Sequence, residues 1–206
     1  IDVIDRILKK HHLNYSIEFY PWKRALALLE VGKTCHLTLS ASYNKWRDNA
    51  FYLVNWYKTK KYYFYWKPQH PNGLHIKKLS DLKKYRLGGV FGYSYAYLGD
   101  IENNIDKGAK DFDALIQKLQ RGRYDLFVEQ FEVMAGFAVI GKDYLGIPGL
   151  VFEPVPELSP TWFSMLVSKN YKHAQELKRI LSEGVSDILW KGDHVALLKK
   201  HGLKAN

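Results

Sequence analysis

Two stretches of this sequence share an order of features that strongly constrains the fold. Each is an amphipathic helix pattern followed by a glycine and then by a strand pattern, and such helix-to-strand units build α/β folds. The matching positions are Leu26, Leu29, Gly32 and Leu37 in the first stretch and Ile116, Leu119, Gly122 and Phe127 in the second. Any two such units resemble one another, so two explanations stay open: a true repeat with two similar α/β lobes, or coincidence.

A true repeat would place the two strand ends in equivalent positions. These ends are Ser40 in the first unit and Gln130 in the second. Ligands of open α/β sheets bind beyond the carboxyl ends of the strands. A cleft between two lobes is therefore where we expect the functional residues.

The hydrophobic spacing predicts the remaining elements around these two units. A helix carries Ile4, Ile7 and Leu8 and ends near His12, and a second helix begins at Pro21 and stops at Gly32. The other predicted elements are a strand over 34–39, a strand over 62–66, a capped short helix at 80–82, a strand over 162–167, a helix from about Tyr171 and a final helix with Val195, Leu197 and Leu198.

Composition narrows the class of protein. Lysine and arginine number 31 against 21 aspartates and glutamates, and this excess suits an acidic partner. No apolar run reaches the roughly 20 residues that a membrane-spanning helix needs. A single cysteine, Cys35, excludes an internal disulfide, and its place in a strand pattern predicts a buried structural thiol. The eight histidines have no metal-binding spacing, so we expect no metal site.

Two further segments allow a functional interpretation. The aromatic and lysine run over 56–63 resembles a stacking platform for nucleic acid, but a sheet strand with its lysines directed outward explains it better. The glycines over 88–92 do not match a dinucleotide fingerprint. We expect Gly92 to end a strand, and Tyr93 and Ser94 to start a helix whose amides form an anion site.

The segment from Ser40 to Arg47 is the most informative. It directly follows the predicted strand and carries two hydroxyls, at Ser40 and Ser42. Arg47 follows Ser42 by five residues, in the next turn of the chain. The planar fork of an arginine holds a carboxylate through two hydrogen bonds, and hydroxyls add neutral ones. A carboxylate-bearing ligand fits this arrangement.

At these residues the chain resembles the family 3 bacterial extracellular solute-binding proteins, which include amino-acid receptors of ABC importers. The similarity extends over nearly the whole chain, through loose motifs in the expected order. The matching segments are 21–25, 40–42 with Arg47, 51–54, 87–94, 119–125 and 163–169.

The resemblance implies a type II periplasmic binding protein fold, α/β, with two lobes and a hinged cleft. Lobe one is expected over 1–58 and 161–206, and lobe two over 59–160. No signal peptide is visible at the start of the sequence, so we expect either that a leader has been removed or that the chain is a fragment. The resemblance also implies a first strand before helix one, and this sequence lacks it, so we expect part of lobe one to be absent. The implied function is capture of a small carboxylate-bearing solute in the periplasm for a membrane permease or a sensor, by a monomer without cofactor or nucleic-acid partner.

By the same resemblance Arg47 holds the carboxylate, helped by Ser42 and Ser94. The receptors place an aspartate for the ammonium where this chain has Gln130, so a plain amino acid ligand becomes doubtful. The full candidate set is Trp22, Ser40, Ser42, Arg47, Tyr93, Ser94, Glu129 and Gln130. Two alternatives remain: a dehydratase-like enzyme of this fold with Glu129 as acid or base, and a basic nucleic-acid-binding protein.

Overall fold

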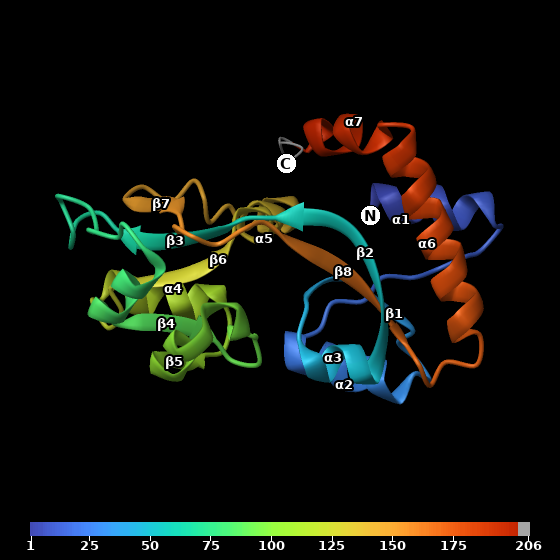
Figure 1. Ribbon diagram of the computed structural model, residues 1–206, viewed down its shortest axis with the longest axis horizontal. Coiled ribbons are helices and arrows are strands. Elements are labelled where there is room, and N and C mark those ends of the chain that lie inside the picture. Colours follow the sequence, from blue (N-terminus) through green and yellow to red (C-terminus); the bar gives the residue numbers. More distant parts are fainter. Residues whose placement is uncertain (202–206) are drawn as a thin grey trace. The chain divides into compact units, whose positions relative to one another are not determined.

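The computed structural model describes residues 1–201, and 202–206 of the expected first lobe lie outside the described residues. The chain divides into two compact units (Figure 1). Unit 1 comprises Ile1–Lys58 and Trp162–Asn206, and unit 2 comprises Thr59–Thr161. The chain therefore crosses between the units twice, at the ends of two strands.

Unit 1 is a three-stranded sheet with helices on both faces. Its strands are ordered β1-β8-β2, and β1 runs antiparallel to β8 with Leu37 opposite Val167. The elements of unit 1 are α1 (Asp2–Lys10), α2 (Trp22–Val31), β1 (Leu37–Ser42), α3 (Lys45–Ala50), β2 (Phe51–Thr59), β8 (Thr161–Ser168), α6 (Ala174–Trp190) and α7 (Asp193–Lys200).

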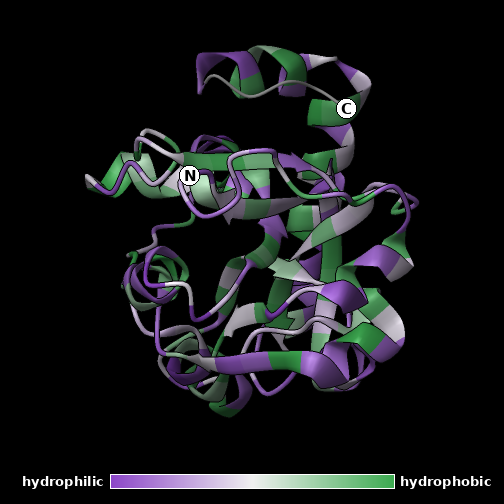
Figure 2. Ribbon diagram, turned by 90° about the vertical axis from the view of Figure 1, so that its left-hand side faces the viewer, coloured by the Kyte–Doolittle hydropathy of each residue, from purple (hydrophilic) through white to green (hydrophobic). Residues whose placement is uncertain are grey.

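The period-2 alternation of β8 explains these layers. Met165 and Val167 pack with Ile4, Ile7 and other residues of α1 and α6 on one face of the sheet. Leu166, between them in sequence, packs on the opposite face with residues of α2 and β1. Both faces of this strand are therefore buried. Figure 2 shows helices banded in hydrophilic and hydrophobic colours, as expected of helices that bury one side.

Unit 2 contains a five-stranded mixed sheet in the order β5-β4-β6-β3-β7 (Figure 1). Strand β4 is parallel to β5 and β6, whereas β3 is antiparallel to β6 and β7. The elements of unit 2 are β3 (Lys61–Trp66), η1 (Leu79–Lys84), β4 (Leu87–Val90), η2 (Ala96–Asn104), β5 (Ile105–Ala109), α4 (Phe112–Gln120), β6 (Leu126–Gln130), α5 (Phe131–Gly136), η3 (Phe137–Ile140) and β7 (Leu150–Pro154).

The aromatic run of β3 forms the centre of unit 2. Tyr63 and Tyr65 pack on the face that η1 and η2 cover, and Phe64 packs on the opposite face with α4. Phe64 is fully buried and stacks on Phe127 of β6, with ring centroids 4.9 Å apart and planes 5° from parallel. The aromatics are therefore core residues of a sheet, as the spacing predicts.

Both predicted helix-glycine-strand units are present. Gly32 ends α2 with φ 69°, and Gly122 follows α4 with φ 71°, a left-handed conformation that glycine adopts without strain. The predicted strand bounds are wrong in the first unit, since β1 starts at Leu37 and extends to Ser42. Cys35 lies before this strand and is half-buried, and burial raises the pKa of its thiol.

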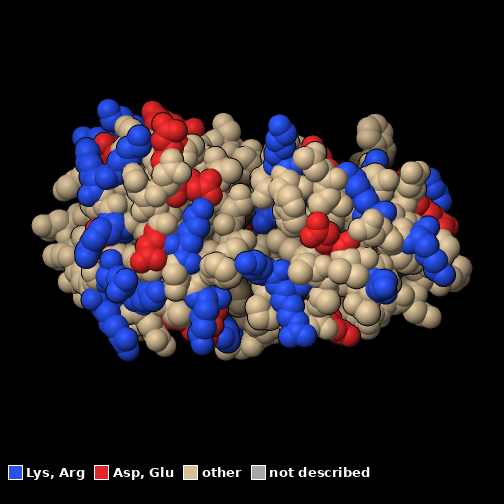
Figure 3. Space-filling view, turned by 90° about the horizontal axis from the view of Figure 1, so that it is seen from below, with Lys and Arg blue, Asp and Glu red and all other residues tan. Residues whose placement is uncertain are grey.

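Charged residues are mixed over the surface. On the face in Figure 3, lysines and arginines lie among aspartates and glutamates on each unit, as expected of a basic excess distributed over the surface. No helix among residues 1–201 has the length and hydrophobicity to cross a bilayer.

Candidate functional site

Arg47 is positioned by a capped helix directly after β1. The Asn44 side chain accepts a hydrogen bond from the Arg47 backbone N–H at 2.8 Å, and α3 starts at the next residue, Lys45. Asparagine is a preferred N-cap because its oxygen satisfies a free amide in the first turn. The cap therefore fixes the backbone of Arg47 close to the end of the strand.

The Arg47 guanidinium is held by two other residues of unit 1. Its Nη1 donates to the Ser42 carbonyl oxygen at 2.6 Å, and its carbon lies 5.3 Å from the centroid of the Trp22 ring. Arg47 is only 3% exposed. A guanidinium stacks well on an aromatic face, so Arg47 takes part in the packing of unit 1.

Trp22, Ser42 and Arg47 thus lie together in unit 1. Ser40 lies within β1 rather than after it, at an irregularity where the pairing with β8 shifts between Thr38 and Ala41. Such bulges redirect side chains and recur beside functional sites. Ser40 and Ser42 are both half-buried.

Glu129 and Gln130 end strand β6 in unit 2 and are 4% and 2% exposed. The Gln130 backbone N–H donates to Glu129 Oε1 at 2.9 Å. Burial raises the pKa of the Glu129 carboxyl, while the charge of Lys61 and this hydrogen bond act in the opposite direction. The strand end therefore combines a neutral amide with a buried carboxyl group.

Lys61 is a candidate that the sequence analysis missed. The run over 56–63 is expected to direct its lysines outward, yet Lys61 is 4% exposed and lies opposite Gln130 in the pairing of β3 with β6. Its Nζ lies 4.2 Å from the centroid of the Tyr97 ring, a favourable position for a cation. The only signal in the sequence is its place at the start of an otherwise apolar strand.

Tyr93 and Ser94 follow the turn after β4 and are half-buried. The expectation that they start a helix is wrong, because η2 begins at Ala96. Tyr95 lies directly before η2 and is 2% exposed. The Val90 N–H donates a hydrogen bond to the Tyr95 hydroxyl oxygen over 2.8 Å, so Tyr95 is held by β4 and the helix starts after it. Tyr93 packs edge-on against Phe112 of α4, with ring centroids 5.8 Å apart.

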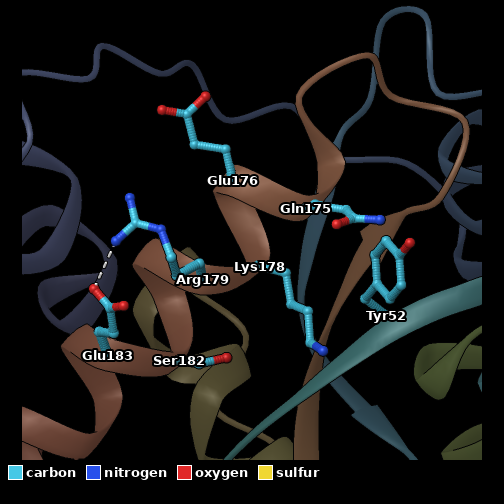
Figure 4. Close-up of a pocket in the computed structure, with 7 residues that line it drawn as sticks. All are labelled: Tyr52, Gln175, Glu176, Lys178, Arg179, Ser182 and Glu183. Atoms are coloured by element: carbon cyan, nitrogen blue, oxygen red, sulfur yellow. Dashed lines mark hydrogen bonds and ion pairs between the residues drawn. The ribbon is translucent and has the colours of Figure 1, made fainter.

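A pocket of about 650 Å³ lies elsewhere on unit 1, as Figure 4 shows. Its lining consists of Tyr52, Gln175, Glu176, Lys178, Arg179, Ser182 and Glu183. Arg179 and Glu183 pair with each other at 2.9 Å, and the charges of the lining are balanced. None of the sequence-predicted site residues lines this pocket. Within residues 1–201, no group of three or more metal-ligating side chains has a suitable arrangement for an ion.

No protein-family model and no curated protein matches this chain. Solved structures do match. One is the arginine-, lysine-, histidine-binding protein ArtJ from Geobacillus stearothermophilus, with 16% identity and a TM-score of 0.75 over 100% of this chain and 85% of that chain. Another is the substrate-binding protein AbpA of an amino acid ABC transporter from Streptococcus pneumoniae, bound to L-arginine, with 16% identity and a TM-score of 0.73 over 97% and 81%.

A histidine kinase sensor domain with similarity to periplasmic binding proteins matches equally well. Its identity is 16% and its TM-score 0.74, over 100% of this chain and 86% of that chain. These three structures are binding proteins or a sensor domain rather than enzymes. At such identities the comparison concerns the fold, and the fold is the one that the resemblance to family 3 implied. This chain has the two-sheet α/β fold of the periplasmic solute-binding proteins.

Proposed function

We propose that this protein reversibly binds a small carboxylate-bearing solute, an amino acid or a related compound, in the periplasm. Arg47 binds the carboxylate, with Trp22, Ser40 and Ser42 beside it in unit 1. Tyr93, Ser94, Glu129 and Gln130 of unit 2 are the other candidate ligand-binding residues. The bound form is recognised by the permease of an ABC importer or by a sensor.

The observation that carries this proposal is the fixed guanidinium of Arg47. Its contacts with the Ser42 carbonyl and the Trp22 ring orient the planar fork before any ligand arrives. Pre-organisation lowers the entropy lost on binding, and a fork matches a carboxylate in two hydrogen bonds.

The direct test is a thermal-shift screen of the purified protein against amino acids, small peptides and organic acids, followed by calorimetry of each compound that raises the melting temperature. A solute at 100 times its dissociation constant stabilises the folded protein by about 2.7 kcal/mol. We expect at least one carboxylate-bearing compound to do so. A screen in which none raises the melting temperature would contradict the proposal.

Gln130 reports whether the solute carries an ammonium group. We expect Gln130→Asp to raise the affinity for an ammonium-bearing solute about tenfold, and to lower the affinity for a simple acid by a similar factor, because a charged acceptor bonds about twice as strongly as a neutral one. Isothermal titration of both solute types measures the change. Gln130→Ala is the control, since it removes the acceptor without adding charge. Equal responses of the two solute types to Gln130→Asp would contradict this role.

A further inference from the structure

The segment from Lys67 to Arg86 in unit 2 is strongly basic. It connects β3 to β4 and contains η1 (Figure 1). Its lysines and arginine number six, against the single acidic residue Asp81, so it carries half of the net charge of +10 of the whole chain. All six cationic side chains are exposed: Lys67, Lys77, Lys78, Lys83, Lys84 and Arg86.

Asp81, the one carboxylate of this segment, is buried and fully engaged. It is 5% exposed, and its Oδ2 accepts hydrogen bonds from the backbone N–H groups of Lys77 and Lys78, at 2.9 and 3.1 Å. Its Oδ1 accepts one from Lys84 Nζ at 2.7 Å. The Lys84 side chain, and then these backbone donors, lower the pKa of the Asp81 carboxyl to about 2. The charge of Asp81 is therefore compensated within the segment.

Arg86 is paired as well, and four lysines remain. The Arg86 atoms Nη2 and Nε donate to the two carboxylate oxygens of Asp125, at 2.7 and 3.1 Å. Within the described part of the chain, the ion pairs of this segment engage His70, Lys84 and Arg86. We define the basic surface as the exposed lysines that no ion pair among residues 1–201 engages: Lys67, Lys77, Lys78 and Lys83.

Hydrogen bonds fix the loop before η1 against the residues that follow it. The His75 backbone N–H donates to the Tyr85 hydroxyl oxygen at 2.9 Å. The Leu79 backbone N–H, at the start of η1, donates to Glu157 Oε2 at 2.8 Å. Because the backbone is held at these points, binding at the basic surface has to order only the lysine side chains, and its entropic cost is lower.

We propose that the basic surface binds the anionic headgroups of a lipid bilayer. Clusters of four or more lysines attract anionic lipids, and no fixed geometry is required. A lysine has a compact charge on a flexible stem, which suits headgroups that move within the bilayer. A partner with fixed carboxylates is better matched by the planar fork of an arginine, and the one arginine of this segment is occupied by Asp125.

The basic surface also lacks the aromatic rings that favour nucleic acid. Among residues 1–201, none of the exposed large hydrophobic side chains lies between residues 67 and 86. Single-stranded nucleic acid binds through such rings, on which its bases stack. With no apolar side chain to insert, binding to a bilayer is electrostatic, and salt reverses it. The inference concerns unit 2 alone and does not depend on the proposed solute site.

The test is co-sedimentation of the full chain at low ionic strength with two kinds of vesicle. One consists of phosphatidylcholine, which is neutral, and the other contains an equal part of phosphatidylglycerol, which is anionic. We expect binding to the anionic vesicles alone, and release in about 1 M salt, where the Debye length is about 3 Å. Each surface lysine strengthens such binding about fivefold, so replacing all four by glutamine weakens it by roughly several hundred-fold.

A matched variant controls for net charge. It replaces by glutamine four exposed lysines of unit 1, each of which pairs with an aspartate: Lys9, Lys10, Lys191 and Lys200. Both variants lose four positive charges at exposed positions, and their melting temperatures check that they fold. We expect the control variant to bind the anionic vesicles as the wild type does, because only lysines at the bilayer surface contribute to binding.

Three results would overturn the inference. The first is no binding of the wild type to the anionic vesicles, or equal binding to both kinds of vesicle. The second is an equal loss of binding in both variants, because net charge then acts without the basic surface. The third is a single-stranded DNA oligonucleotide that binds more tightly than the anionic vesicles at the same salt concentration, with loss of this binding in the basic-surface variant. The solute screen bears on the proposed function alone.

Discussion

We expect Arg47→Ala to weaken binding of the solute by about thirty-fold to several thousand-fold. Removing one partner of a desolvated, charge-assisted contact costs about 2–5 kcal/mol, and each 1.4 kcal/mol is a factor of ten. Arg47→Lys recovers only part of the affinity, because a single ammonium cannot match both carboxylate oxygens as the fork does. Isothermal titration of the three proteins with the best compound of the screen measures these differences.

The same substitution also destabilises unit 1. Arg47 is buried, donates to the Ser42 carbonyl and packs on Trp22, so alanine removes a hydrogen bond from a charged group worth about 1.5–3 kcal/mol. The titration must therefore be carried out below the lowered melting temperature. Arg179→Ala is the matched control, because Arg179 is an exposed arginine of unit 1 whose guanidinium pairs with Glu183. An Arg47→Ala protein that is folded and binds like the wild type would remove the basis of the proposed function.

The local pattern of the sequence was sufficient to predict most helices. Apolar residues spaced three and four apart identify the buried face of α1, and a glycine marks the end of α2, because both signals act within one segment. The aromatic run of β3 likewise predicts a strand, and the structure buries both of its faces. These features depend on neighbours in sequence, so sequence is enough to find them.

The sequence-based predictions are wrong where contacts with a distant segment of the chain determine a strand boundary or the burial of a side chain. The predicted strand over 34–39 begins three residues too early, because the pairing with β8 starts at Leu37 opposite Val167. Burial of Arg47 and Lys61 was missed for the same reason. A charged side chain is buried only when another segment supplies a partner, and here those partners include the rings of Trp22 and Tyr97. No periodicity in the sequence indicates such pairs.

Lys61→Met is expected to destabilise unit 2 by about 3–5 kcal/mol near neutral pH, the usual cost of removing one partner from a buried pair of charges. Lys61 and Glu129 are both 4% exposed, and the charge of Lys61 lowers the pKa of Glu129 against the larger effect of burial. Without Lys61 the Glu129 carboxylate stays buried with less compensation. Urea unfolding of the wild type and the variant measures the loss.

The pH dependence of this loss follows from Glu129. Burial holds its folded pKa above the ordinary value of 4.5, so the folded chain binds more protons than the unfolded chain between these two pKa values. The stability that protonated Glu129 contributes is therefore fully present below pH 4.5. This contribution falls as the pH rises through the folded pKa of Glu129. Lys61→Met raises that pKa further. The variant is therefore expected to lose more stability relative to the wild type at about pH 7 than at about pH 5.

Two further variants identify the buried pair as the cause. Lys60→Met changes the exposed neighbour of Lys61 and is expected to alter stability by no more than about 0.5 kcal/mol. The double variant Lys61→Met with Glu129→Gln removes both charges, and it is expected to recover most of the stability that the single variant loses, because no uncompensated charge stays buried. If the double variant is as unstable as Lys61→Met alone, the buried carboxyl group of Glu129 is not the cause of the loss.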